Sequence, residues 1–231
     1  MSNRLELIAS FVSDGVGVCD VGTDHAYLPA LIAKRGYSGN IIATDINEGP
    51  ILKARRNLQA EGLSEIVKLY MCDGLDAVSP CDIDTIIIAG MGGDTMTGIL
   101  DRAEWCQEKC KRLILQPATK PEILRFWLIN NGFIIASERQ ILENDTLYQV
   151  IVAEPGTDRR YLDSELYTGK FELICESEYF DELLTTHIKR FDSAKRSLAE
   201  AKREGLDSWA AMIAVMSDEL KRMMEIKYEN G

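Results

Sequence analysis

The chain has 231 residues, of which 46% are hydrophobic and 27% charged, and its formal net charge is −11. This length allows one domain of average size and a smaller second one, and no apolar run reaches the roughly 18 residues that a membrane-spanning helix requires. The acidic balance by itself argues against a nucleic-acid partner, because phosphate binding requires a basic surface.

The N-terminal segment carries Glu6 and lacks a small-residue cleavage site, so it does not resemble a signal peptide, and we expect a cytoplasmic protein. The six cysteines form no C-x-x-C pair and the chain has only two histidines. We therefore expect reduced thiols and no metal site. No pattern in the sequence favours one oligomeric state.

The first 154 residues alternate between strand-like and helix-like segments. Strands are predicted at 16–20, 40–45, 66–71, 84–89 and 112–116, and helices at 4–12, 26–35, 48–60 and 122–130. A glycine-rich turn is expected at 90–93, and Pro117 is expected to end the fifth strand. Residues 133–142 and 147–154 predict a terminal hairpin that adds an antiparallel strand at the sheet edge. This order predicts an α/β, Rossmann-like domain with a mostly parallel sheet.

The pattern changes after Glu154. The sequence P-G-T-D at 155–158 indicates a boundary. Beyond it, residues 180–203 and 208–228 have apolar residues at helical spacing and predict an antiparallel, coiled-coil-like helical hairpin. We therefore expect two domains, 1–156 and 157–231.

The loop after the first predicted strand is acidic and poor in glycine. In an open parallel sheet, ligands bind beyond the carboxyl ends of the strands. Here that position holds Asp20, Gly22, Asp24 and His25, whereas a dinucleotide-binding loop would show G-x-G-x-x-G to admit a pyrophosphate. Acids disfavour phosphate and suit an ammonium group. The loop therefore favours S-adenosylmethionine (AdoMet), which has an ammonium and no phosphate, over NAD, FAD or ATP.

Acids also end the next two strands. Asp45 lies about 20 residues after Gly22, where a carboxylate can accept two hydrogen bonds from a ribose diol. Asp73 can accept a hydrogen bond from an adenine amino group, and Gly74 leaves room for the ring. With Asp20, three acids at three successive strand ends form the pattern that predicts an AdoMet site.

The fourth predicted strand ends in A-G-M-G-G-D at 89–94. Many base-methylating enzymes carry an N/D-P-P-Y/F motif at this place, and this chain lacks it. Its glycines permit close approach of the backbone to the methyl donor or the target base. The alternative is a plain glycine-rich turn before the next helix.

Several strings together resemble one family. They are D-V-G-T-D-H-A-Y-L-P at 20–29, A-T-D-I-N at 43–47, D-G-L at 73–75, A-G-M-G-G at 89–93, Arg4-Leu5 and Gln116-Pro117. They resemble the TrmK family of bacterial tRNA methyltransferases, which act on N1 of adenine 22. The resemblance covers nearly the whole chain and implies a class I AdoMet fold, a C-terminal coiled-coil domain and tRNA as substrate. It implies a cofactor site that we extend to the neighbouring residues: Asp20, Gly22, Asp45, Ile46, Asp73, Gly74, Gly90 and Met91.

Methylation of adenine N1 needs alignment and charge stabilisation more than a strong base, because the N1 lone pair attacks directly. The product is cationic until a proton leaves the exocyclic amine. Asp24 and Asp94 are the candidate stabilising carboxylates, and His25 is a candidate proton acceptor with a structural role as the alternative. Tyr27 and Gly92 are candidate contacts of the target base, and Tyr27 is alternatively a partly buried helix residue.

A basic stripe in the C-terminal helices runs against the acidic net charge. Lys189, Arg196 and Arg203 recur every seven residues, share a helix face, and are expected to contact tRNA phosphates. The alternative is a solvated face paired with local acids. Two other functions remain open: a small-molecule methyltransferase of the same fold, and a non-catalytic AdoMet-fold binding module.

Overall fold

A computed structural model describes residues 2–13, 15–109, 112–200 and 206–229. The chain divides into two compact units, Met1–Asp158 and Arg159–Gly231. The sequence places the boundary two residues earlier, after residue 156. Each unit is described by itself.

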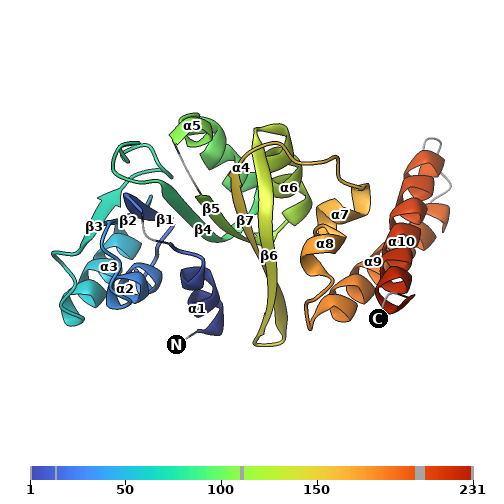
Figure 1. The fold of residues 1–231 in the computed structure, drawn as a ribbon, viewed down its shortest axis with the longest axis horizontal. Helices are drawn as coiled ribbons and strands as arrows, with labels where there is room; N and C mark the ends of the chain where they lie inside the picture. The colour runs from blue at the N-terminus through green and yellow to red at the C-terminus, as the bar shows by residue number, and fades with distance from the viewer. Residues whose placement is uncertain (1, 14, 110–111, 201–205, 230–231) are drawn as a thin grey trace. The chain divides into compact units, whose positions relative to one another are not determined.

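The first unit is built on a seven-stranded sheet (Figure 1). Its strands are β1 (Gly17–Val21), β2 (Asn40–Asp45), β3 (Val67–Met71), β4 (Thr85–Gly92), β5 (Arg112–Thr119), β6 (Phe133–Glu143) and β7 (Thr146–Pro155). The spatial order is β3-β2-β1-β4-β5-β7-β6. Strands β1 to β5 pair in parallel, and β7 pairs antiparallel with both β5 and β6. The predicted α/β class is confirmed, but the antiparallel strand β7 lies inside the sheet and β6 forms the edge.

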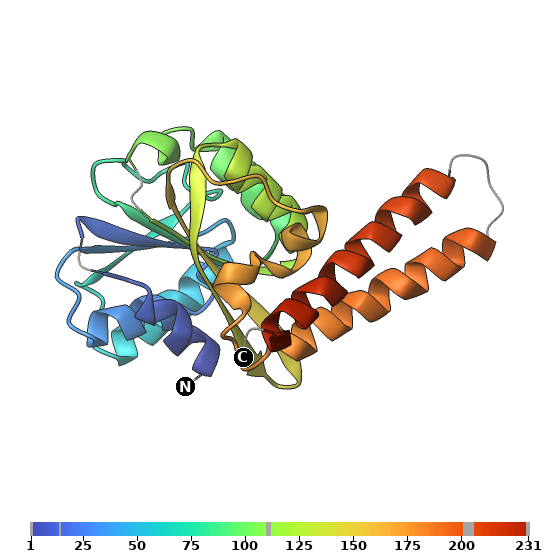
Figure 2. The ribbon, with the colours of Figure 1, turned by 45° about the vertical axis from the view of Figure 1, so that its right-hand side comes forward.

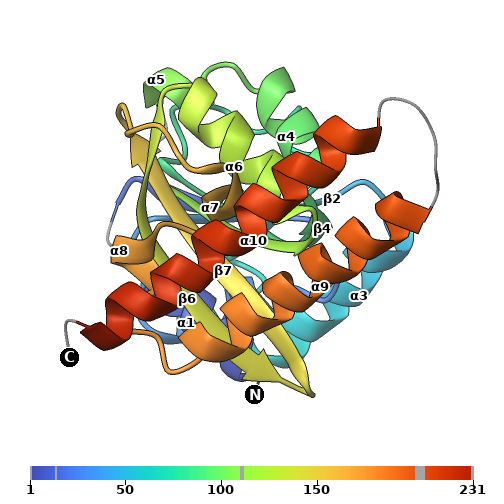
Figure 3. The same ribbon diagram turned by 90° about the vertical axis from the view of Figure 1, so that its right-hand side faces the viewer.

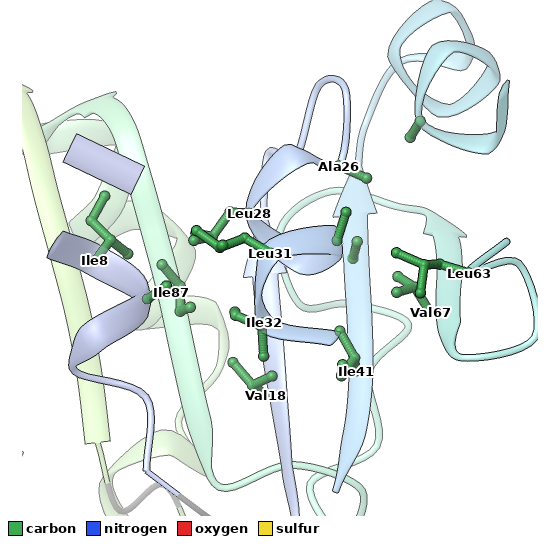
Figure 4. Packing of buried hydrophobic residues seen from close by; sticks show 14 of the residues in the cluster. Ile8, Val18, Ala26, Leu28, Leu31, Ile32, Ile41, Leu63, Val67 and Ile87 are labelled. Atoms are coloured by element: carbon green, nitrogen blue, oxygen red, sulfur yellow. The ribbon is translucent and has the colours of Figure 1, made fainter. Parts of the chain in front are cut away.

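Helices cover both faces of this sheet, with α2 and α3 on one side and α4 and α6 on the other (Figure 1). The helices are α1 (Asn3–Ser10), α2 (Tyr27–Lys34), α3 (Glu48–Ala60), α4 (Gly93–Arg102), α5 (Cys106–Lys109) and α6 (Pro121–Asn130). Figure 4 shows Leu28, Leu31 and Ile32 of α2 packed toward Val18 and Ile87 of the central strands. Burial of each such aliphatic side chain contributes about 1.5–3 kcal/mol to the stability of the fold. This packing holds in place the strand ends that carry the candidate site.

The carboxyl ends of β4 and β5 differ from the prediction. The turn expected at 90–93 is wrong, because β4 continues to Gly92 and α4 begins at Gly93. The β4–β5 register shifts between Ala89 and Met91 and again between Met91 and Gly92, so this end of β4 is irregular. Pro117 also does not end β5. The pairing of β5 with β7 spans only residues 113–115, so the missing N–H of Pro117 interrupts no hydrogen bond to β7.

The predicted hairpin is confirmed. A two-residue turn, Asn144-Asp145, joins β6 to β7, and both residues have positive φ, at 50° and 57°. This is the conformation of a type I′ turn, whose twist matches that of paired strands and which Asn and Asp tolerate.

The second unit is helical, with α7 (Asp163–Thr168), α8 (Phe171–Ile174), α9 (Phe180–Glu200) and α10 (Leu206–Glu229). Figures 2 and 3 show α9 and α10 running side by side as an antiparallel hairpin. The Ser217 hydroxyl donates to the Asp192 carboxylate at 2.8 Å, and the Tyr228 hydroxyl donates to Asp181. The predicted helical hairpin is therefore present. The sequence did not predict α7 and α8, which are too short to show a period.

Among the described residues, no helix has both the length and the apolar character to cross a membrane. The described part of the chain also brings together no group of three His, Cys, Asp or Glu side chains suited to hold a metal ion.

Candidate functional site

The carboxyl ends of the central strands meet at one edge of the sheet. Strand β1 lies between β2 and β4, with Val21 in register with Thr44 and Ile88. The segments that leave these strands therefore start side by side, and they contain most of the predicted site residues.

Asp20 is a buried carboxylate near the end of β1, with 6% of its surface exposed. The Thr23 hydroxyl donates to it at 2.6 Å. Burial raises the pKa of Asp20 to about 6, the Thr23 hydrogen bond opposes this shift, and the neighbouring Asp45 adds to it. No cation among the described residues forms an ion pair with Asp20.

Asp45, at the end of β2, is 8% exposed and held by backbone amides. The N–H of Asp24 donates to its Oδ2 at 3.3 Å, and the N–H of Asn47 donates to its Oδ1 at 3.0 Å. Both oxygens are thus oriented, and each retains further capacity to accept a hydrogen bond. The described residues provide no ion-pair partner for this carboxylate either.

The loop after β1 turns sharply. The N–H groups of Gly22 and Thr23 both donate to the Thr44 carbonyl, at 2.8 and 2.9 Å. Asp24 and Ala26 adopt left-handed φ angles of 49° and 55°, a conformation that costs non-glycine residues free energy and is concentrated at functional sites.

This loop brings together three predicted site residues. The rings of His25 and Tyr27 stack with their centroids 5.2 Å apart, and His25 Nε2 lies 3.4 Å from Asp24 Oδ2. Asn57 of α3 donates to the His25 carbonyl at 3.0 Å, which fixes the backbone. Tyr27 begins α2 and is 53% exposed, so it is a helix residue, as the alternative has it, and much of its surface stays accessible to a ligand.

The end of β3 is arranged differently. The Asp73 carboxylate lies 2.7 Å from the Arg102 guanidinium of α4. It is therefore paired with a cation, whereas Asp20 and Asp45 form an ion pair with none of the described residues. Gly74 has a positive φ of 59°, and its carbonyl accepts a hydrogen bond from Thr44 at 2.8 Å. Ile46, which follows Asp45, is exposed.

The end of β4 presents open backbone. Gly90 is exposed with φ 79°. At Gly93 an added β-carbon would lie 2.1 Å from the Lys120 carbonyl oxygen, so the start of α4 packs directly on the backbone before α6. Gly92, between them, lies in register with Thr119 of β5.

The Asp94 carboxylate, next to this backbone, pairs with Lys120 at 2.8 Å. This hydrogen bond lowers the pKa of Asp94 and keeps the carboxyl ionised. Sequence reasoning missed Lys120 and Arg102 as partners of Asp94 and Asp73, because each lies 26 or more residues away from its acid in the sequence. It also missed Thr23, whose spacing of three residues from Asp20 was available as a signal.

The second unit carries part of the predicted stripe. Lys189 and Arg196 are exposed on α9, and neither forms an ion pair with another described residue. The third member, Arg203, lies outside the described residues.

The geometry of the first unit fits AdoMet. Two buried carboxylates lie at adjacent strand ends beside a glycine with positive φ, and no cation of the described residues pairs with either. Carboxylates accept hydrogen bonds from hydroxyl and ammonium groups, which are the donors that AdoMet offers, and they disfavour a pyrophosphate.

Comparison with known proteins gives a consistent result. The family model described as a methyltransferase domain matches residues 1–151. The Bacillus subtilis tRNA (adenine(22)-N(1))-methyltransferase is 30% identical over 206 residues, which cover 87% of each chain. Among solved structures, the B. subtilis m1A22 tRNA methyltransferase TrmK superposes with a TM-score of 0.86 at 28% identity, covering 96% of this chain and 98% of that one. A Streptococcus pneumoniae protein in complex with S-adenosyl-L-methionine superposes with a TM-score of 0.76 at 34% identity, covering 94% and 99%. The chain therefore belongs to the TrmK family of methyltransferases.

Proposed function

We propose that this chain transfers a methyl group from AdoMet to N1 of an adenine in tRNA, at position 22 by similarity to its relatives. The observation that carries the proposal is the pair Asp20 and Asp45, two buried carboxylates at adjacent strand ends with which no cation in the described part of the chain pairs. Combined with membership of the family, this pair supports AdoMet as the cofactor.

When bound, AdoMet would supply an electrophilic methyl group, whose bond to the sulfonium sulfur breaks as the bond to N1 forms, so that neutral S-adenosylhomocysteine leaves. In our proposal Asp20 accepts hydrogen bonds from its ammonium and Asp45 from its ribose hydroxyls. The turn at Gly22 lets the backbone approach closely. Ile46, Asp73 and Gly74 would hold the adenine end of the cofactor, and Gly90 and Met91 would border its methyl-donor end.

The target adenine attacks through its N1 lone pair, so the protein's task is alignment and stabilisation of the positive charge that develops. We assign this stabilisation to the Asp24 and Asp94 carboxylates. His25, stacked on Tyr27 and close to Asp24, takes the proton from the exocyclic amine. Tyr27 and the backbone at Gly92 hold the base.

We assign tRNA binding to the helical domain, residues 157–231, and catalysis to residues 1–156. Lys189, Arg196 and Arg203 are the proposed phosphate contacts. The exposure of the first two, and their lack of ion pairs among the described residues, support this assignment. A tRNA substrate would place the activity in the cytoplasm.

The test for the acids is the variant D24N, with methyl transfer to tRNA and AdoMet affinity measured separately. We expect turnover to fall at least tenfold while the AdoMet Kd stays within about twofold, because Asp24 donates to Asp45 through its backbone N–H, which the substitution keeps. E104Q, which removes an exposed carboxylate before α5, is the matched control. Unchanged turnover in D24N would remove Asp24 from the chemistry.

The two alternative functions predict other results. A small-molecule methyltransferase would bind AdoMet and leave every tRNA unmodified while it methylates another acceptor. A non-catalytic module would bind AdoMet and transfer no methyl group to any acceptor.

A further inference from the structure

Two short motifs from distant parts of the chain meet in the first unit. They are Arg4-Leu5 at the start of α1 and Gln116-Pro117 in β5. The Arg4 guanidinium donates to the side-chain oxygen of Gln116, and the Gln116 amide nitrogen donates to the Pro117 carbonyl at 3.0 Å. Gln116 is fully buried. Its amide is therefore fixed with the oxygen toward Arg4.

Three other contacts hold the same guanidinium and its helix. It lies 4.7 Å from the centre of the Tyr148 ring, and its Nε lies 3.5 Å from Glu143. Glu143 also accepts a hydrogen bond from the Ser2 hydroxyl at 2.6 Å. Even so, 24% of the Arg4 side chain remains exposed. An arginine that is held on several sides and still open on one is preorganised to bind an anion.

The cluster borders the proposed donor site. Gln116 lies in register with Ala89 of β4, and the next β4 residue, Gly90, is exposed. An added β-carbon on Gly90 would meet no heavy atom of the described residues within 4 Å other than those of its chain neighbours. Glu143 ends β6 and Tyr148 lies near the start of the antiparallel β7, so both lie at the same sheet edge as the end of β5.

We propose that Arg4 binds the phosphate of the target nucleotide, with Gln116 and Tyr148 as positioning residues that aim its guanidinium. This inference rests on the proposed function. N1 belongs to the base-pairing edge of adenine, so the base must be extruded before it can react. A fixed contact to the adjacent phosphate holds the extruded nucleotide in register with the methyl donor. The planar guanidinium matches phosphate oxygens in a bidentate fashion.

The test compares R4Q with R35Q. Arg35, at the end of α2, forms an ion pair with Glu6 of α1, the helix that also carries Arg4. R35Q therefore controls for loosening of α1. For R4Q we expect the KM for tRNA to rise at least tenfold and the AdoMet Kd to change less than twofold. The salt dependence of tRNA affinity should fall by about 0.7–0.9 in log–log slope, the loss of one phosphate contact. R35Q should match the wild type.

A second pair of variants keeps the proposal testable if R4Q fails to fold. Y148L removes the ring beneath the guanidinium and should raise the KM for tRNA severalfold. Y148F retains the ring and should have a KM close to that of the wild type. Equal effects of R4Q and R35Q, an unchanged salt slope in R4Q, or equal behaviour of Y148L and Y148F would overturn the inference. The salt slope is also measured by direct tRNA binding. A wild-type protein that binds tRNA through Arg4 without methylating it would contradict the proposed activity and leave the phosphate contact standing.

Discussion

The terminal methyl group of Met91 occupies the place where a side chain on Gly22 would begin: an ideal β-carbon on Gly22 would lie 2.1 Å from Met91 Cε. Gly22 also has a positive φ of 73°. The Met91 side chain, from the end of β4, thus packs directly on the backbone of the loop after β1. Gly22 and Met91, which the sequence assigns to the cofactor site from separate motifs, are therefore in direct contact.

Replacement of Gly22 by alanine should therefore weaken AdoMet binding by at least tenfold. The left-handed backbone alone costs a non-glycine residue about 1–2 kcal/mol, and the Met91 methyl group must move in addition. G36A is the matched control, because Gly36 has φ 82° and no described atom near its added β-carbon other than chain neighbours. Calorimetric titration with AdoMet and urea unfolding separate the two effects. If G22A and G36A bound AdoMet with equal affinity, the contact between Gly22 and Met91 would not be part of the AdoMet site.

The raised pKa of Asp20, about 6, predicts a pH dependence of binding. Protonation of this carboxyl removes the charge that we assign to the AdoMet ammonium. The AdoMet affinity should therefore fall as the pH drops through about 6 and stay level between pH 7 and 8. Titrations from pH 5 to 8 measure it. A flat profile, or normal affinity in D20N, would rule out this role for Asp20.

The same carboxyl affects folding in the opposite sense. Because its folded pKa lies above its usual value of 3.8, the folded state holds the proton more tightly, and stability falls as the pH rises from about 4 through 6. At pH 8, D20N should thus be more stable than the wild type, by at most a few kcal/mol, since one pKa unit corresponds to about 1.4 kcal/mol. Urea unfolding at pH 4 and pH 8 checks it. No gain in D20N at pH 8 would show that the buried charge is not costly.

Much of the first unit follows from the sequence, for a physical reason. Its strands are continuous apolar runs bounded by acids and glycines, and α3 carries a Pro50 in its first turn and Gly62 beyond its end. Those signals are local, so residues 40–45 and 48–60 were predicted with the bounds that the structure shows. The prediction that Pro117 ends the fifth strand was wrong, because a proline interrupts a strand only where the neighbouring strand requires a backbone N–H at that position. Here β7 pairs with β5 only at 113–115.

The sequence predicts which residues lie at the candidate site, but it does not predict which of them contact one another. The positions of Asp20 and Asp45 follow from strand order, but whether a strand-end acid pairs with a cation depends on residues far away in the chain. Arg102 reaches Asp73 and Lys120 reaches Asp94, and no spacing rule connects such pairs. The Arg4–Gln116 contact also spans 112 residues and emerges only when α1 folds over the sheet edge.

A buried ion pair holds the edge hairpin to α6. Arg125 Nε donates to Glu138 Oε1 at 2.8 Å, and both side chains are fully buried. R125M should lower the free energy of unfolding by about 3–5 kcal/mol, because it leaves Glu138 charged and buried. The double variant R125M/E138L should recover part of this loss. K34M, which breaks the exposed pair with Glu61, should cost less than about 1 kcal/mol. A loss in R125M no larger than in K34M would show that the buried pair is energetically neutral.

The stripe on α9 predicts a salt effect on tRNA binding. K189E/R196E should weaken tRNA affinity at least tenfold in low salt and lower the log–log salt slope by about 1.5, the loss of two phosphate contacts. K53E/R56E on α3 introduces the same change in net charge and should have the smaller effect. Filter binding at several salt concentrations measures both variants. Equal losses would mean that net charge, and not the stripe, governs binding.

The central claim is the transfer of a methyl group to N1 of a tRNA adenine. The most direct measurement incubates the protein with labelled AdoMet and unmodified bacterial tRNA, digests the product to nucleosides, and maps the modified position. We predict labelled 1-methyladenosine at position 22, lost in the D24N variant. Labelled tRNA without 1-methyladenosine, or no label in tRNA despite AdoMet binding, would contradict the account.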